Sequence, residues 1–221
     1  MRRLALLVIA GCGRLGFEPG TLTPDANDGD VLDPSCFVEP FDNLDTARWR
    51  TSFPPNSVTV AVANGRLELT PAPLVNEYNG LSNRNRIDLT DAAIEVELVQ
   101  TTNQSNTETS LEIEITQTSR YIVAATDGRL KFIERGAGNE VDRVLDTTAH
   151  RFWRMRHDAA AARVTLQTSS DRTQWSSGAS FGAPATAASY VYLYAGQFGA
   201  GNPSPGTGMF DNVRVVTPNC P

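Results

Sequence analysis

Apolar and polar residues alternate along most of the chain between residues 57 and 216. A period of two gives a β-strand one apolar face and one polar face. No stretch shows a helical period of convincing length. Short strands at regular spacing predict an all-β fold, an antiparallel two-sheet jelly-roll sandwich. The predicted strands cover 37–44, 57–63, 66–70, 93–99, 111–115, 120–125, 129–134, 140–145, 150–157, 163–168, 190–195 and 209–216.

Two dipeptides predict tight hairpins between these strands. Asn64-Gly65 and Asp127-Gly128 each separate two alternating runs. A type I′ turn needs positive φ at both central residues, which Asn, Asp and Gly tolerate best. The polar stretch 79–86 is expected to be a loop, and Trp49 is expected to be a core aromatic residue.

The first and last segments of the predicted domain resemble each other. Each contains a Phe-Asp-Asn triplet beside a cysteine, at residues 41–43 near Cys36 and at residues 210–212 near Cys220. We therefore expect the first and last strands to lie side by side. An even pair of cysteines in an exported chain predicts a disulfide between Cys36 and Cys220.

The N-terminus has the features of a secretion leader. Residues 1–11 hold two arginines and a seven-residue apolar run, far shorter than the roughly 20 residues needed to span a bilayer. Ile9-Ala10-Gly11-Cys12 resembles the bacterial lipobox, which implies that Cys12 is lipidated. We expect a protein anchored in the bacterial cell envelope, in the outer membrane facing the periplasm or the surface. The alternative is a chance cysteine in an apolar leader.

The amino-acid composition indicates where the linker ends and the domain begins, and which partners are excluded. Residues 12–35 are rich in Pro, Gly and Asp without apolar periodicity, which predicts a flexible acidic linker before a domain at 36–221. The chain has 19 Lys and Arg against 25 Asp and Glu, a formal net charge of −6. This balance argues against nucleic acid as a partner. We expect a monomer.

Four segments, in order, resemble the concanavalin A-like lectin/glucanase superfamily of laminin-G-like jelly rolls. They are Phe41-Asp42 with Trp49, then 64–69, then 153–156 followed by Ser170-Asp171 and Trp175, and finally 210–213. The resemblance covers about residues 36–220 and implies the same sandwich. The superfamily contains lectins, hydrolases and adhesion modules, so the fold alone does not decide the function.

The resemblance also suggests a metal site. Jelly rolls of this superfamily often hold a structural Ca²⁺, bound by carboxylates and backbone carbonyls. Asp42 and Asp211 would approach each other if the terminal strands pair, and Glu39 could join them. The alternative is that both aspartates cap turns by accepting nearby backbone N–H groups.

Glu112 and Glu114 are the candidates for catalysis. They stand at i and i+2, so both side chains point to one face of a strand. Retaining glycoside hydrolases of family 16 carry Glu-x-Asp-x-(x)-Glu on such a strand, which would make Glu112 the nucleophile and Glu114 the helper. The acid/base positions hold Thr116 and Gln117, which cannot donate a proton near neutral pH. The preferred interpretation is therefore non-catalytic.

A charge ladder is the alternative for these glutamates. Glu95 and Glu97 repeat the same spacing on an earlier strand, and Arg154 and Arg156 alternate on a later one. Opposite charges facing each other across neighbouring strands stabilise a sheet. Under this interpretation all four glutamates would lie on a solvated strand face opposite the arginines.

Tyr190, Tyr192 and Tyr194 fall on one face of a predicted strand. An aromatic platform with hydroxyl groups suits stacking on sugar rings. Glu112, Glu114 and Arg154 could share that sheet face and hydrogen-bond sugar hydroxyls. The alternative is that the tyrosines face the core.

The sequence thus favours a glycan- or partner-binding jelly roll without catalysis, whose partner is a polysaccharide or another cell-envelope component. A glycoside hydrolase using Glu112 and Glu114 is one alternative. A structural envelope protein without a small ligand is another.

Overall fold

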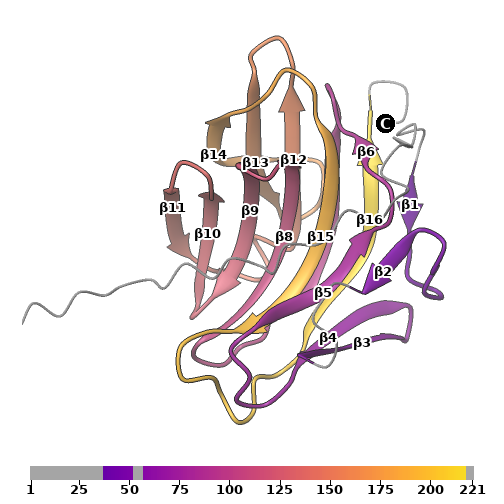
Figure 1. Cartoon of the computed structure of the whole chain (residues 1–221). Helices are drawn as coiled ribbons and strands as arrows, with labels where there is room; N and C mark the ends of the chain where they lie inside the picture. The colour runs from indigo at the N-terminus through magenta and orange to yellow at the C-terminus, as the bar shows by residue number, and fades with distance from the viewer. Residues whose placement is uncertain (1–36, 52–56, 218–221) are drawn as a thin grey trace, which may run out of the picture.

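The computed structural model describes residues 37–51 and 57–217, which form sixteen strands and no helix. The strands make two antiparallel sheets of eight, stacked face to face (Figure 1). The predicted all-β sandwich is confirmed. Within the described part of the chain, no helix is long and apolar enough to cross a membrane.

The first sheet has the strand order β14-β13-β12-β7-β16-β4-β3, with β1 also paired to β16. Its strands are β1 (Val38–Glu39), β3 (Val58–Ala63), β4 (Arg66–Pro71), β7 (Ala93–Gln100), β12 (Phe152–Asp158), β13 (Arg163–Ser169), β14 (Ser176–Gly182) and β16 (Gly208–Val216).

The second sheet has the order β11-β10-β9-β8-β15-β5-β2, with β6 also paired to β15. Its strands are β2 (Trp49–Thr51), β5 (Tyr78–Asn83), β6 (Ile87–Asp88), β8 (Thr107–Thr116), β9 (Ser119–Thr126), β10 (Arg129–Glu134), β11 (Asn139–Val144) and β15 (Ala188–Gln197).

Both predicted hairpins form with the expected turn geometry. Asn64 and Gly65 have φ values of 55° and 69°, and they connect β3 to β4. Asp127 and Gly128 have φ values of 49° and 70°, and they connect β9 to β10. Positive φ at both central positions matches the right-handed twist of the flanking strands.

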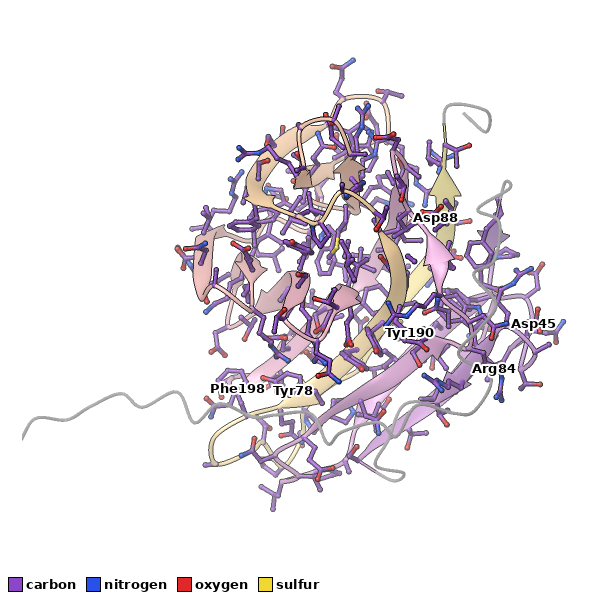
Figure 2. All side chains as sticks on the ribbon, turned by 45° about the horizontal axis from the view of Figure 1, so that its top comes forward. Asp45, Tyr78, Arg84, Asp88, Tyr190 and Phe198 are labelled. Carbon is purple, nitrogen blue, oxygen red and sulfur yellow. The ribbon has the colours of Figure 1, made fainter. Side chains whose placement is uncertain are left out.

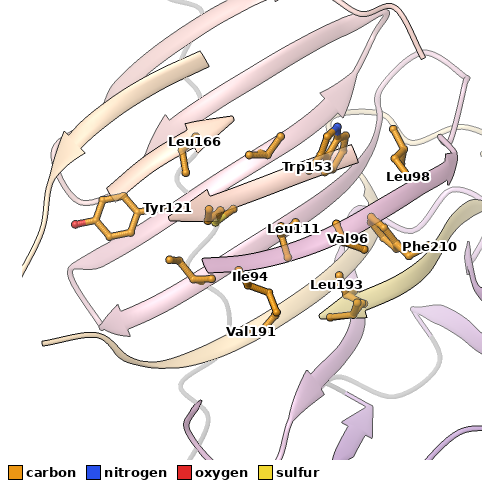
Figure 3. Packing of buried hydrophobic residues seen from close by; sticks show 14 of the residues in the cluster. Ile94, Val96, Leu98, Leu111, Tyr121, Trp153, Leu166, Val191, Leu193 and Phe210 are labelled. Carbon is orange, nitrogen blue, oxygen red and sulfur yellow. The ribbon is translucent and has the colours of Figure 1, made fainter. Parts of the chain in front are cut away.

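The core lies between the two sheets and is made by the apolar residues of the alternating pattern. Figure 3 shows this packing, in which Trp153, Leu111 and Val191 come from three different strands and meet in one layer. Trp49 is 1% exposed, so its predicted place in the core is confirmed. The opposite faces of both sheets are left for polar side chains.

The first and last strands lie side by side, as expected. Strand β1 pairs with β16 through Val38 with Arg214 and Glu39 with Val213. The strand predicted over 37–44 is shorter than expected, since β1 has two residues and Phe41 has a φ of 52°. The leader, the linker, Cys12 and the predicted Cys36–Cys220 disulfide all lie outside the described residues.

The expected loop at 79–86 is wrong, because most of it is strand β5. This strand lies between β15 and β2, and its residues from Asn79 to Asn83 are buried. Its polar side chains bond inside the protein: the Asn83 side-chain oxygen accepts the Val191 N–H at 2.6 Å. A strand buried on both faces shows no alternation, so the pattern missed it. Strand β14, which is rich in Ser and Gly, was missed as well.

Candidate functional site

The site is built on two neighbouring strands of the second sheet, β8 and β15. Across this pair Tyr190 faces Glu114 and Tyr192 faces Glu112. The intervening residues of β15, such as Val191 and Leu193, belong to the core. The tyrosines and glutamates therefore occupy the outer surface of the sheet. We call this surface the tyrosine face and define it by Tyr190, Tyr192, Tyr194, Glu112, Glu114 and Arg120.

The three tyrosines form a continuous row along β15. The rings of Tyr192 and Tyr194 stack with centroids 5.1 Å apart, and Tyr190 lies 6.3 Å from Tyr192. Tyr192 is buried, whereas Tyr190 and Tyr194 are half-buried. Figure 2 shows Tyr190 on the sheet; Tyr78 pairs with Gly196 at the other end of β15.

Arg120 connects the two glutamates. Its Nη2 atom lies 2.8 Å from Glu114 Oε2, and its Nη1 atom lies 3.8 Å from Glu112 Oε1. Burial raises the pKa of Glu112 above its ordinary value, while Arg135 and Arg120 act to lower it and Glu114 adds to the rise. The Nε atom of Arg120 is buried without a hydrogen-bond partner among the described residues.

Tyr192 is a fixed hydrogen-bond donor at this place. Its hydroxyl donates to Glu114 Oε2 over 3.3 Å. Burial, followed by the charge of Glu114 and of Glu112, raises the pKa of Tyr192 well above its ordinary value of 10.0. The phenol therefore keeps its proton to a higher pH than an exposed tyrosine does.

The end of β8 does not supply a third acidic group to the pair. Thr116 is exposed, and its hydroxyl lies 3.3 Å from the hydroxyl of Thr118 in the turn before β9. The pairing with β9 is irregular between Glu114 and Thr116. The two acid/base positions therefore carry a hydroxyl group, on Thr116 at the end of β8, and an amide group, on Gln117 in the turn that follows.

Arg154 does not belong to this surface, so the prediction that it shares a face with Glu112 and Glu114 is wrong. It lies on β12 in the first sheet, where it binds Glu95 and stacks 3.9 Å from the Trp175 ring centroid. The chain passes from the second sheet to the first between β11 and β12. Alternation shows which residues share a strand face, but it does not show to which sheet the strand belongs.

The single charge ladder is wrong for the same reason. Glu95 and Glu97 lie on the first sheet, while Glu112 and Glu114 lie on the second. Glu95 does face Arg154 across the strands, as the ladder predicted. It is 0% exposed rather than solvated, since arginines cover it.

Two arginines beside Tyr190 were missed by the sequence analysis. The Arg86 guanidinium carbon lies 4.9 Å from the Tyr190 ring centroid, and that of Arg50 lies 5.5 Å away. Arg86 Nη1 also donates to the backbone oxygens of Ile115 and Ala188 at 2.9 and 3.2 Å. Arg86 lies in a stretch expected to be a loop, and no pattern linked either arginine to the tyrosines.

The calcium candidates do not come together as a ligand group. Glu39 is buried and accepts the Phe41 N–H and the Trp49 indole N–H, both at 3.0 Å. Asp211 accepts the N–H of the next residue at 2.6 Å, and Asp42 is exposed. Among residues 37–51 and 57–217, no group of three or more His, Cys, Asp or Glu side chains could hold a metal ion. Calcium binding stays a prediction.

No protein-family model matches this sequence, and a search of curated proteins found no significant match. Solved structures do resemble it. A prokaryotic β-1,3-1,4-glucanase (lichenase) from a mouse hindgut metagenome aligns with 83% of this chain and 99% of its own, at 13% identity and a TM-score of 0.60. An endo-β-1,3-glucanase from Pyrococcus furiosus aligns with 82% of this chain and 93% of its own, at 10% identity and a TM-score of 0.54.

A lectin-like protein has the same architecture. Arcelin-5, a lectin-like defense protein from Phaseolus vulgaris, aligns with 82% of this chain and 96% of its own, at 10% identity and a TM-score of 0.54. The chain therefore has the concanavalin A-like jelly-roll fold. Its structural neighbours are mostly glycoside hydrolases and glucanases. At such identities the likeness concerns the fold and does not transfer an activity.

Proposed function

We propose that this protein is a glycan-binding jelly roll of the bacterial cell envelope that acts without catalysis. The observation that carries the proposal is the row of three tyrosines on β15 beside a pair of glutamates on β8. Aromatic rings with hydroxyl groups offer an apolar surface to the faces of sugar rings and hydrogen bonds to their edges. Carboxylates add acceptors for sugar hydroxyls.

The acid/base positions at the end of β8 hold Thr116 and Gln117 and so carry no carboxyl group, which supports binding rather than hydrolysis. A retaining hydrolase needs a carboxylate to attack the anomeric carbon and an acid to protonate the departing oxygen, with the two groups about 5–5.5 Å apart. Thr116 and Gln117 cannot supply that proton. Glu114 is already engaged within the fold, by the Arg120 guanidinium and the Tyr192 hydroxyl.

Titration of the full chain with soluble β-glucan oligosaccharides and other glycans, followed by calorimetry, tests the proposal. Tyr194→Ala should weaken binding about 5- to 150-fold, because one stacked ring contributes about 1–3 kcal/mol. Trp175→Ala is the matched control, since it removes an aromatic ring from the outer face of the first sheet. If no glycan binds, or if both variants weaken binding equally, the proposal is refuted and a structural envelope role is favoured.

A glycoside hydrolase is the second candidate, and the environment of Glu112 favours it. Burial raises the pKa of Glu112, and a raised carboxyl pKa is typical of the general acid in glycoside hydrolases. Release of reducing sugar from β-glucans by the full chain, abolished in Glu112→Gln, would establish this activity. Release that persists in Glu112→Gln, or no release at all, would exclude it for this pair.

The cell-envelope location rests on Cys12, which lies outside the described residues. We expect mass spectrometry of the protein expressed in a didermic bacterium to find a lipid on Cys12, and Cys12→Ser to move the protein out of the membrane fraction. Unreduced peptide mapping of the same sample should contain a Cys36–Cys220 disulfide. An unmodified, soluble protein with free thiols would refute both.

A further inference from the structure

The tyrosine face is flanked by arginines at both ends. Arg86 and Arg50 lie beside Tyr190, at the edge toward β6 and β2. Arg135 follows β10 at the opposite edge, where its N–H donates to the Arg120 carbonyl at 3.0 Å. A line of side chains therefore crosses the strands from Tyr190 through Glu114 and Arg120 to Arg135, and it has an arginine at each end. In this subsection, the row means this line across the strands.

The register gives the extent of this row. Tyr190 pairs with Glu114 across β15 and β8, and Glu114 pairs with Arg120 across β8 and β9. Arg135 is bonded to Arg120 on the next strand. Neighbouring strands lie about 4.7–4.9 Å apart, so the row from Tyr190 to Arg135 spans roughly 14 Å perpendicular to the strands. That is long enough for a short oligosaccharide rather than a single sugar.

The charge of the row is opposite to that of the chain. Four arginines stand against the two glutamates of the site, although acidic residues outnumber basic ones by 25 to 19 in the whole sequence. Next to the row, Lys131 pairs with Glu140 and Arg129 pairs with Asp142, so each of these pairs is neutral by itself. Glu108 lies four residues before Glu112 on β8, away from the Tyr190 end.

The fixed orientation of Arg86 and the exposure of Arg135 suit an anionic ligand. Arg86 Nη1 is fixed by two backbone carbonyls, which orient its planar guanidinium beside the Tyr190 ring. Arg135 is exposed and forms no side-chain hydrogen bond or ion pair with the described residues. A guanidinium held in one orientation binds a carboxylate or sulfate through two parallel hydrogen bonds.

We propose that the tyrosine face selects anionic glycans, in which carboxylate or sulfate groups pair with Arg86 and Arg135 while sugar rings lie on the tyrosines. This inference rests on the proposed glycan-binding function and adds the chemical class of the ligand. A sugar ring would stack on Tyr190, and the acidic groups would meet Arg86 at one end of the row and Arg135 at the other.

Calorimetry with the full chain and three ligands of equal length tests the class: a neutral gluco-oligosaccharide, an oligogalacturonate and a sulfated oligosaccharide. We expect at least one anionic ligand to bind about tenfold more tightly than the neutral one at low salt, with the difference shrinking as salt screens exposed charges. If the oligogalacturonate binds more tightly than the sulfated oligosaccharide, the acidic group is a carboxylate. If the sulfated oligosaccharide binds more tightly, it is a sulfate.

Arg135→Gln tests the residue assignment, because this exposed side chain forms no hydrogen bond or ion pair with the described residues and its charge reaches Glu112 only at a distance. It should weaken the anionic ligand about 2- to 5-fold and leave the neutral ligand unchanged. Arg163→Gln, on the outer face of the first sheet, is the control and should change neither affinity. Neutral and anionic ligands that bind equally well would overturn the inference and keep the proposed function. No binding by any of them would overturn both.

Discussion

The buried ion cluster on the first sheet gives the sharpest stability prediction. Glu95 is 0% exposed and lies between Arg154 on β12 and Arg214 on β16. Its Oε1 atom accepts Arg154 Nε at 2.7 Å and also Arg154 Nη2, and its Oε2 atom accepts Arg214 Nε at 2.8 Å. One carboxylate thus satisfies two arginine side chains that are 18% and 31% exposed.

Glu95→Ala removes that carboxylate and leaves both cations without their partner. Breaking a buried ion pair costs about 3–5 kcal/mol, and we expect about 3 kcal/mol because Arg214 can still reach water. For a domain of this size, that loss lowers the Tm by roughly 6–12 °C. Glu95→Gln should lose less stability than Glu95→Ala, since the amide oxygen still accepts from one arginine. It should still lose some, because the amide NH₂ group is a donor and cannot accept from the other.

Urea unfolding followed by tryptophan fluorescence measures these free energies of unfolding. Glu140→Ala is the matched control, because the Lys131–Glu140 pair is partly exposed and such pairs contribute about 0–1 kcal/mol. Replacing Glu95 by Leu together with Arg154 by Met should recover much of the loss, since apolar side chains of similar volume avoid the desolvation cost. A Glu95→Ala variant within about 1 kcal/mol of the Glu140→Ala variant would refute the reasoning.

Two further predictions concern packing and pH. Gly178→Ala should destabilise the fold by about 1–3 kcal/mol, because its Cβ would lie 2.2 Å from the buried Phe132 ring. Gly182→Ala on the same strand is the control and should be nearly neutral, since its Cβ would meet nothing within 4 Å. Equal urea midpoints for the two variants would contradict this prediction. Since burial raises the pKa of Glu112, the stability gained from its neutral form is complete below its ordinary value of 4.5 and is lost as pH rises through the folded-state value. Glu112→Gln should therefore flatten the decline in stability above about pH 4.5, and an unchanged slope in urea midpoints across that range would contradict the assignment.

Alternation identified those strands that have one face in the core, because burial on a single face is what produces a period of two. It located the strand with Tyr190 and the strand with Glu112, and it put the two glutamates on the face away from the core. It left open whether the tyrosines face the core. It failed at β5, which is buried on both faces. It also failed for Arg154, because sheet membership depends on pairing between distant segments, and nothing local in the sequence records that pairing.

The two Glu-x-Glu strands show why the site required the structure. Glu95 and Glu97 on β7 and Glu112 and Glu114 on β8 have the same spacing and the same place on an outer sheet face. The first pair binds three arginines and an asparagine, so its charges are compensated within the fold. The second pair shares Arg120, and burial raises the pKa of Glu112. Buried carboxylates whose charge is only partly neutralised by neighbouring cations are common at binding and catalytic sites. For this reason we propose β8, rather than β7, as the strand that carries the site.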